Sequence, residues 1–215
     1  MILLNIEKKD LLLYAVTDRK CLRGISLEYA VEQALLGGVT CVQLREKDAD
    51  EDSIITEAKK LLKICHKYSV PLIINDNYEA ALKCGADGVH VGIEDAPVAE
   101  IRRRAGDGFI IGATAKTIEQ AKLAEVSGAD YLGVGAVFPS PTKKNAVRIT
   151  PEQLTEICCS VSIPAVAIGG INSEIISAIT GCGHCGIAVV SAVFGADDVR
   201  AAAEELRRAA IETVR

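Results

Sequence analysis

The sequence predicts an α/β fold, a single (β/α)8 TIM barrel that spans residues 1–215. Eight short apolar segments alternate with helix-like stretches, which is typical of parallel strands joined by helical crossovers. An internal repeat precedes every second segment, and 215 residues suit one domain with a sizeable core. Eight strands that repeat in pairs favour a closed barrel over the alternative, an open doubly wound sheet.

The expected strands are apolar runs bounded by glycine, polar or charged residues. In chain order they cover residues 11–17, 41–46, 72–75, 88–92, 109–114, 131–138, 165–171 and 186–194. The stretches between them carry helix signals. Thr117 with Gln120 and Thr150 with Gln153 have the spacing of a capping box, in which two side chains satisfy free backbone groups at a helix start.

The internal repeat connects helices to strands. In each copy an alanine-rich helical run leads to a glycine, and aliphatic residues follow that glycine by four and six positions. The glycine is expected to end the helix or to form the turn into the strand. The copies are Gly38/Val42/Leu44, Gly85/Val89/Val91, Gly128/Leu132/Val134 and Gly183/Ile187/Val189.

Composition narrows the class of protein. Hydrophobic residues make up 49% of the chain and aromatic residues only 4%, which fits a compact enzyme packed with small aliphatic side chains. The net charge of −5 argues against a general nucleic-acid binder, which needs a broad basic surface. The chain has no apolar run of membrane-spanning length and no signal-peptide pattern. We therefore expect a cytoplasmic protein with no nucleic-acid or membrane partner, whose cysteines stay reduced.

Charged residues follow the second expected strand. Gln43, Arg45 and Lys47 alternate with Leu44 and Glu46, so the first three share one face of the strand and the other two share the opposite face. Two cations and an amide then meet at the carboxyl end of the strand, where barrels place their ligands. This arrangement suits a phosphorylated small molecule.

Two carboxylates follow the next strands. Asp76 comes after Asn75 at the end of the third expected strand, and Asp95 follows the fourth. Carboxylates from neighbouring strand ends can share one Mg²⁺, which completes its shell with water and substrate phosphate oxygens. The alternative is that Asp76 caps the next helix and Asp95 starts the turn before Pro97.

A second anion site is expected near the last strands. Phosphate sites in such barrels often use backbone N–H groups after strands seven and eight, where Gly170 and Ser191 lie. The sixth strand leads into Ser140, Thr142 and Lys143, which can bind an anion, although ordinary loops use the same residue types. Thr114, at the end of the fifth strand, can put a hydroxyl group into the mouth of the barrel.

Together these segments resemble the thiamine phosphate synthase family, in order and over nearly the whole chain. The matching residues are Gln43-Leu44-Arg45-Glu46-Lys47, Asn75-Asp76, His90-Val91-Gly92 with Asp95, residues 135–143, Ile168-Gly169-Gly170-Ile171 and Val190-Ser191. Each segment alone is unspecific, but the ordered set is specific. The resemblance implies a (β/α)8 barrel that joins hydroxymethylpyrimidine diphosphate to hydroxyethylthiazole phosphate and releases pyrophosphate.

The resemblance also implies a role for each matching residue. Asp76 and Asp95 would bind Mg²⁺. The pyrimidine diphosphate would be held by Gln43, Leu44, Arg45, Glu46, Lys47, Asn75, Thr114 and Lys143. The thiazole phosphate would be held by Ser140, Thr142, Gly170, Val190 and Ser191, and Pro141 is a further expected substrate-binding residue.

The chemistry implied by the family agrees with these residues. Pyrophosphate leaves, a pyrimidine-stabilised carbocation forms, and the thiazole nitrogen attacks it. Such a reaction needs charge stabilisation at the leaving group and no protein nucleophile. Arg45, Lys47 and Lys143 are therefore the expected catalytic residues, and the expected partners are the two phosphorylated substrates, with self-association as a further candidate. The chain departs from the usual family pattern at Ile93, Thr114, Lys116, Ala136 and Ser140.

Three alternatives compete with this interpretation. The related thiazole tautomerase would need a catalytic histidine at the position of Ala136. A Schiff-base aldolase would need a lysine inside the barrel, and strands six and seven offer none before Lys143. A metal-binding protein would use Cys182, His184 and Cys185, although a single Cys-x-x-Cys is a weak zinc signal and a structural turn explains it better.

Overall fold

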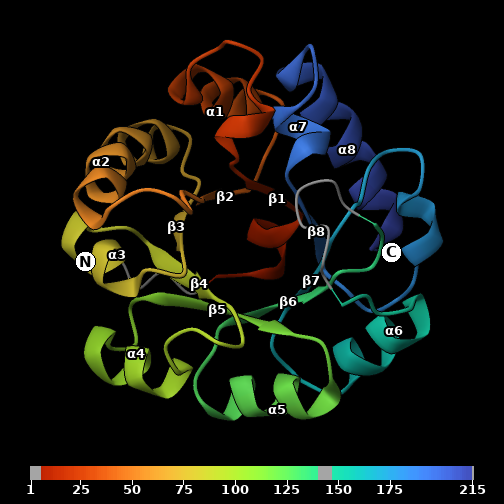
Figure 1. Cartoon of the computed structure of the whole chain (residues 1–215). Coiled ribbons are helices and arrows are strands. Elements are labelled where there is room, and N and C mark those ends of the chain that lie inside the picture. The colour runs from red at the N-terminus through yellow and green to blue at the C-terminus, as the bar shows by residue number, and fades with distance from the viewer. Residues whose placement is uncertain (1–5, 140–146, 215) are drawn as a thin grey trace.

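The computed structural model describes residues 6–139 and 147–214 and confirms the closed barrel. Parallel strands pair in sequence order, and the last closes the ring against the first, so the open-sheet alternative is wrong. Figure 1 shows the strands as a central ring surrounded by helices. The strands are β1 (Leu13–Val16), β2 (Cys41–Leu44), β3 (Leu72–Asn75), β4 (Gly88–Val91), β5 (Ile110–Ala115), β6 (Tyr131–Gly135), β7 (Ala165–Ile168) and β8 (Gly186–Val189).

Helices form the outer layer of the molecule. The α-helices are α1 (Leu27–Leu36), α2 (Glu51–Lys67), α3 (Tyr78–Cys84), α4 (Val98–Ala105), α5 (Ile118–Val126), α6 (Pro151–Cys159), α7 (Ser191–Phe194) and α8 (Val199–Thr213). Short 3₁₀ helices are η1 (Lys8–Leu11), η2 (Arg19–Cys21) and η3 (Ile176–Ile179). Between β7 and β8 the crossover contains η3 where the barrel pattern predicts an α-helix.

Alternation along each strand divides the core into two layers. Leu13 and Ala15 of β1 belong to the outer layer, which packs strands against helices. Tyr14 and Val16 of the same strand belong to the inner layer inside the barrel. Residues two positions apart on a strand therefore belong to the same layer, and every second residue faces the barrel interior.

The internal repeat has the expected structural role. Its glycines Gly38, Gly85, Gly128 and Gly183 all have positive φ, between 74° and 95°, a conformation that glycine adopts without steric cost. All eight aliphatic residues of the repeat lie in the outer core layer. The repeat therefore encodes a helix end followed by a strand whose apolar residues face the helices.

Both predicted helix starts are capped, but in different ways. At α6 the capping box is complete, because Thr150 accepts from the N–H of Gln153 and the side chain of Gln153 accepts from the N–H of Thr150. At α5 Thr117 accepts from the N–H of Gln120, but Gln120 Oε1 accepts from the N–H of Lys116 at 2.8 Å. The second helix start is therefore capped by a shifted version of the predicted pair.

Six predicted strands were too long at their carboxyl ends, the first, second and fourth by one or two residues and the last three by three or more. The sixth strand ends at Gly135 and the seventh at Ile168, where Gly169 and Gly170 take positive φ and leave the extended conformation. The eighth ends at Val189, and the predicted segment 186–194 includes the helix α7. Apolar residues continue past each of these last three strands because they pack under the loops, so hydropathy alone does not mark the ends.

Candidate active site

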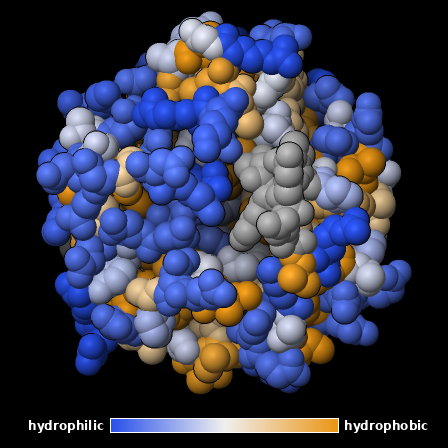
Figure 2. Space-filling view, viewed as in Figure 1, coloured by the Kyte–Doolittle hydropathy of each residue, from blue (hydrophilic) through white to orange (hydrophobic). Residues whose placement is uncertain are grey.

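The carboxyl ends of the strands surround a cavity of about 820 Å³. Ten of the predicted site residues line it: Gln43, Arg45, Lys47, Asn75, Asp76, Asp95, Thr114, Gly170, Val190 and Ser191. They follow or end β2, β3, β4, β5, β7 and β8, so barrel closure brings them together. The surface over α2 and α3, on one side of this mouth, is mostly hydrophilic (Figure 2).

Of the remaining predicted residues, two lie away from the cavity lining and four are outside the described part of the chain. Leu44 is buried in the outer core layer. Glu46 Oε1 accepts a hydrogen bond from Arg19 Nε at 2.6 Å and does not line the cavity. Ser140, Pro141, Thr142 and Lys143 lie outside the described residues, so their roles stay predictions.

Arg45 and Lys47 place positive charge on one side of the cavity. The backbone N–H of Arg45 donates to Thr17 Oγ1 at 3.0 Å, and its guanidinium Nη1 lies 3.5 Å from Asp18 Oδ2. The side chains of Arg45 and Asp18 are only 17% and 13% exposed. Asp18 thus restrains the guanidinium of Arg45. It was not predicted as a site residue, although its place directly after β1 is the signal that could have suggested it.

Asp76 and Asp95 lie together on the same side of the cavity as Lys47, which acts on the charge of Asp76. Asp76 has φ 64°, its N–H donates to the carbonyl of His90 at 2.8 Å, and Asp95 Oδ2 accepts from the N–H of Gly92 at 2.6 Å. Burial, and after it the neighbouring Asp95 carboxylate, raise the pKa of Asp76 to about 6, although Asn75 and Lys47 act in the opposite direction. The cap of α3 is Asn77 rather than Asp76, because Asn77 Oδ1 accepts from the N–H of Ala80.

The carboxylate pair fits a hard divalent cation. The Asp95 carboxylate and burial both raise the pKa of Asp76, and a cation held by the two carboxylates would relieve this cost of ionising Asp76. Across residues 6–139 and 147–214, no cluster of three or more His, Cys, Asp or Glu side chains is arranged to hold a metal. Two carboxylates without nitrogen or sulfur ligands match Mg²⁺, which keeps several waters, better than zinc.

Backbone groups form the opposite side of the mouth. Gly169 and Gly170 have φ of 105° and 65°, and a Cβ on Gly170 would overlap the carbonyl of Pro139 and lie 2.9 Å from the carbonyl carbon of Phe138. Val190 and Ser191 begin the short helix α7. Close backbone approach after β7 and a helix start after β8 are the features expected of a phosphate site in a barrel.

Polar side chains form the floor of the cavity. Gln43 Nε2 donates to Tyr14 Oη, which lies 2.8 Å from Tyr131 Oη, and His90 contacts both Tyr131 Oη and Thr114 Oγ1 at 3.1 Å. Burial raises the pKa of both phenols well above the usual value and lowers the pKa of His90 to about 4. His90 is therefore a hydrogen-bonded imidazole for which burial disfavours the charged form, and Tyr14 and Tyr131 were not predicted as site residues.

The cavity lining argues against two of the alternatives. Ala136 lines the cavity, where the tautomerase would need a histidine, and a methyl group transfers no proton. Lys47 and Lys116 are the lysines among the described lining residues. Lys47 follows the end of β2 and Lys116 the end of β5, so neither lies within the barrel strands, where a Schiff-base lysine is needed.

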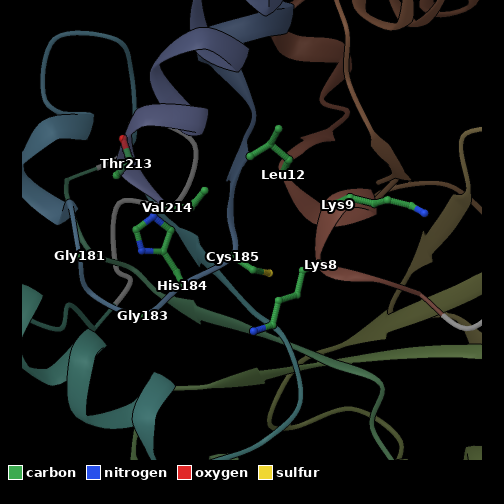
Figure 3. Close-up of a pocket in the computed structure, with 9 residues that line it drawn as sticks. All are labelled: Lys8, Lys9, Leu12, Gly181, Gly183, His184, Cys185, Thr213 and Val214. Atoms are coloured by element: carbon green, nitrogen blue, oxygen red, sulfur yellow. The ribbon is translucent and has the colours of Figure 1, made fainter.

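Cys182, His184 and Cys185 lie at the other end of the barrel, before β8. Among the described residues, these three side chains are not arranged as ligands of a metal ion. His184 and Cys185 line a cavity of about 390 Å³ together with Lys8 and Lys9. The side chain of Lys9 points away from His184 and Cys185 (Figure 3). His184 is 4% exposed, its ring nitrogens have no hydrogen-bond partner, and burial lowers its pKa to about 4. The segment therefore behaves as a buried turn.

Comparison with known proteins gives a consistent result. The sequence model of a family described as thiamine monophosphate synthase matches residues 13–193. A thiamine-phosphate synthase of Clostridium tetani is 46% identical over 197 residues, which cover 92% of this chain and 94% of the relative. One from Pyrococcus abyssi is 44% identical over 201 residues, which cover 94% of this chain and 95% of the relative.

Solved structures extend the comparison to the fold. The structure of a thiamine phosphate pyrophosphorylase from Pyrococcus furiosus has a TM-score of 0.89 and 41% identity, and the match covers 97% of this chain and 99% of that one. A 3-hexulose-6-phosphate synthase, 18% identical with a TM-score of 0.66, shares only the fold. Within the described residues, no helix combines the length and the apolar character needed to cross a membrane.

Proposed function

The chain belongs to the thiamine monophosphate synthase family, and from this premise we propose that it forms thiamine phosphate in thiamine biosynthesis. The reaction joins 4-amino-2-methyl-5-(diphosphooxymethyl)pyrimidine to 4-methyl-5-(2-phosphooxyethyl)thiazole and releases pyrophosphate. The enzyme is then a transferase that acts on two small phosphorylated substrates and requires Mg²⁺.

One observation carries the proposal. Arg45 and Lys47 share a cavity with the carboxylate pair Asp76 and Asp95, so fixed positive charge and a candidate cation site face the same space. The negative charge of a diphosphate is large enough to need both the two cationic side chains and a bound metal ion. An anion with one phosphate group would be served by the cations alone.

Asp76 and Asp95 are the residues that would hold Mg²⁺. When bound, the ion would supply positive charge to the diphosphate oxygens as the leaving group departs. Arg45 and Lys47 would act on the same developing charge from the protein, and we assign Lys143 the same role by its resemblance to the family. The guanidinium of Arg45 is already restrained by Asp18, so little reorganisation is needed when the diphosphate binds.

The other side of the cavity suits the thiazole phosphate. Gly170, Val190 and Ser191 provide backbone N–H groups at a positive-φ turn and at the start of α7. Ser140 and Thr142 are assigned to the same subsite by resemblance, and Pro141 to substrate binding. This arrangement would place the thiazole nitrogen on the side of the pyrimidine opposite the cations, from which it can attack as pyrophosphate leaves.

The residues of the site orient the substrates and stabilise charge, and no protein nucleophile takes part. Gln43 and Asn75 line the cavity beside the cations and would orient the pyrimidine. Burial favours the uncharged forms of Tyr14, Tyr131 and His90, so these three side chains add no anion that would compete with the thiazole nitrogen for the carbocation. The reaction then depends on positioning and on electrostatic stabilisation of the leaving group.

We also propose that the protein works in the cytoplasm and that self-association is its one macromolecular contact. Light scattering on the purified chain would test the second point, since a monomer and a homo-oligomer differ at least twofold in mass.

The first experiment is an assay of thiamine phosphate formation from both substrates, with Mg²⁺ and then with excess chelator. Product that disappears with the chelator and returns with added Mg²⁺ is the expected result. Folded protein that forms no product under any condition would contradict the proposed function, and product that resists the chelator would contradict the metal requirement alone.

A further inference from the structure

The floor of the cavity contains a continuous run of hydrogen bonds, here called the floor chain. Its members are Gln43, Tyr14, Tyr131, His90 and Thr114, from β2, β1, β6, β4 and β5. The successive distances are 2.7, 2.8, 3.1 and 3.1 Å. The two end residues are proposed substrate-binding groups, whereas the three in the middle have no assigned function.

Starting from the donor Gln43, the floor chain can be assigned one consistent direction of hydrogen bonding. Gln43 Nε2 can only donate, so Tyr14 Oη accepts from it. We assign the phenol proton of Tyr14 to Tyr131 Oη at 2.8 Å and the phenol proton of Tyr131 to His90 Nδ1 at 3.1 Å. His90 then carries its proton on Nε2 and donates to Thr114 Oγ1. The hydroxyl proton of Thr114 is left for a ligand.

Glycines make room for the floor chain. A Cβ on Gly112 would overlap the Tyr131 hydroxyl and lie 2.5 Å from His90 Nδ1, so any other residue there would separate the two groups. A Cβ on Gly133 would lie 2.9 Å from His90 Cε1. Both glycines lie within strands, where glycine usually marks close packing of this kind.

The two ends of the floor chain present opposite groups to the cavity. Gln43 lines the cavity and has its amide oxygen free of partners in the described part of the chain, so it offers an acceptor. Thr114 also lines the cavity and offers a donor. Because β2 and β5 lie three strands apart in the closed ring, the two groups approach a ligand from different sides. A 4-aminopyrimidine has a matching pair, since its amino group donates and the ring nitrogen across from it accepts.

We propose that Tyr14, Tyr131 and His90 are positioning residues that keep Gln43 as an acceptor and Thr114 as a donor toward the pyrimidine. The inference rests on the proposed function and adds a basis for substrate selectivity to it. A pyrimidine with a carbonyl oxygen in place of the amino group would set two acceptors against each other at Gln43. The amide could turn over to donate, but its oxygen would then face Tyr14, and every hydrogen bond along the floor chain would have to reverse.

The test measures two constants in each variant. One is KM for the aminopyrimidine diphosphate, and the other is the inhibition constant of the counterpart in which a carbonyl oxygen replaces the amino group. Tyr14→Phe and Tyr131→Phe interrupt the floor chain at different points. Tyr78→Phe removes a tyrosine hydroxyl that contacts Glu79, Glu100 and Arg104 outside the cavity, and serves as the matched control.

The expected result is a change of opposite sign in the two constants. In Tyr14→Phe and Tyr131→Phe the amide of Gln43 is free to turn, so KM for the amino substrate rises while the oxo compound binds about 10-fold more tightly. The control keeps both constants. Loss of packing alone would weaken both ligands together, and a ratio of the two constants does not depend on the fraction of folded protein.

The outcomes separate this proposal from the proposed function. A wild-type protein that makes no thiamine phosphate overturns the proposed function. A wild-type protein that makes product, together with variants in which the ratio of the two constants stays at the wild-type value, overturns the role of the floor chain and leaves the activity in place.

Discussion

Asp76 combines an uncommon backbone with an unfavourable charge. Its φ of 64° lies in the left-handed region, which aspartate and asparagine enter more readily than other non-glycine residues. Its carboxyl group has a pKa raised to about 6 by burial and by Asp95. Both features reduce stability, and they occur together at the point where the proposed metal ion would bind.

Asp76→Asn should lower turnover at least about 100-fold at saturating Mg²⁺, because a neutral amide is a poor ligand for the ion. Asparagine tolerates the left-handed backbone, so the free energy of unfolding should stay equal or rise. Steady-state rates and urea unfolding would measure both effects. Asp52→Asn, on the exposed face of α2, is the control and should keep full turnover; Mg²⁺-dependent rates near wild type in Asp76→Asn would rule out the metal assignment.

His184 should make the fold sensitive to acid. Its pKa is lowered to about 4 by burial, below the value of about 6.5 in an unfolded chain. The unfolded state therefore binds a proton first as the pH falls from 6.5 toward 4, and stability decreases over that window by up to about 3 kcal/mol.

His184→Leu should remove this part of the acid sensitivity, since leucine fills a similar space and carries no unpaired nitrogens. Urea unfolding at pH 7 and pH 5 would show a smaller loss of stability in the variant than in the wild type. His66→Gln removes the exposed histidine that pairs with Asp87 when protonated, and so measures that separate contribution to the pH dependence. An unchanged loss in His184→Leu would mean that another group causes the acid sensitivity.

At the scale of elements, glycine decides where helices stop. Gly85 ends α3 with φ 74°, and a Cβ there would meet no atom within 4 Å. Glycine is therefore favoured at position 85 because of its backbone conformation and not because of a lack of space.

Threonine and glutamine decide where α5 and α6 begin. The hydrogen bond from the Lys116 N–H to Gln120 shows that the same residue pair can satisfy different backbone groups.

Gly85→Ala should lower the free energy of unfolding by about 1 kcal/mol, because alanine in the left-handed region crowds its Cβ against the backbone. Gly85→Asn should cost clearly less, since asparagine tolerates that region. Chemical denaturation of the two variants gives the comparison directly. Equal stability of the wild type and the alanine variant would show that the helix end relaxes to another conformation.

At the scale of the whole molecule, the site is formed by residues from strands all around the barrel. Its residues follow strands from β2 to β8, and β8 pairs with β1, so a ligand that contacts both sides of the mouth bridges the ring. Such a ligand binds only the closed barrel and should stabilise it as a unit.

Mg²⁺ and pyrophosphate together should therefore raise the unfolding free energy by more than the sum of their separate effects. At about 100 times the dissociation constant the gain is roughly 2.7 kcal/mol. Thermal unfolding with each ligand alone and with both would measure it. Asp95→Asn should lose the joint effect but keep the small effect of pyrophosphate alone; a joint effect of full size in that variant would contradict the shared site.

The sequence by itself determined the strands, the repeat and which side chains face inward. Gly38 and Gly85, the alternation of Gln43, Arg45 and Lys47, and the carboxylates after β3 and β4 are local features, because a two-residue period and a helix end depend only on neighbours in the chain. Strand ends were less accurate, since apolar residues continue under the loops.

Only the tertiary structure decided which distant groups meet. The hydroxyls of Tyr14 and Tyr131 are 117 positions apart and touch because barrel closure sets the register of β1 and β6. Asp18 reaches Arg45 because the register of β1 on β2 sets their strand ends side by side, and Glu46 contacts Arg19 instead of lining the cavity. Contacts of this kind depend on the order and shear of the strands, which no local pattern of residues encodes.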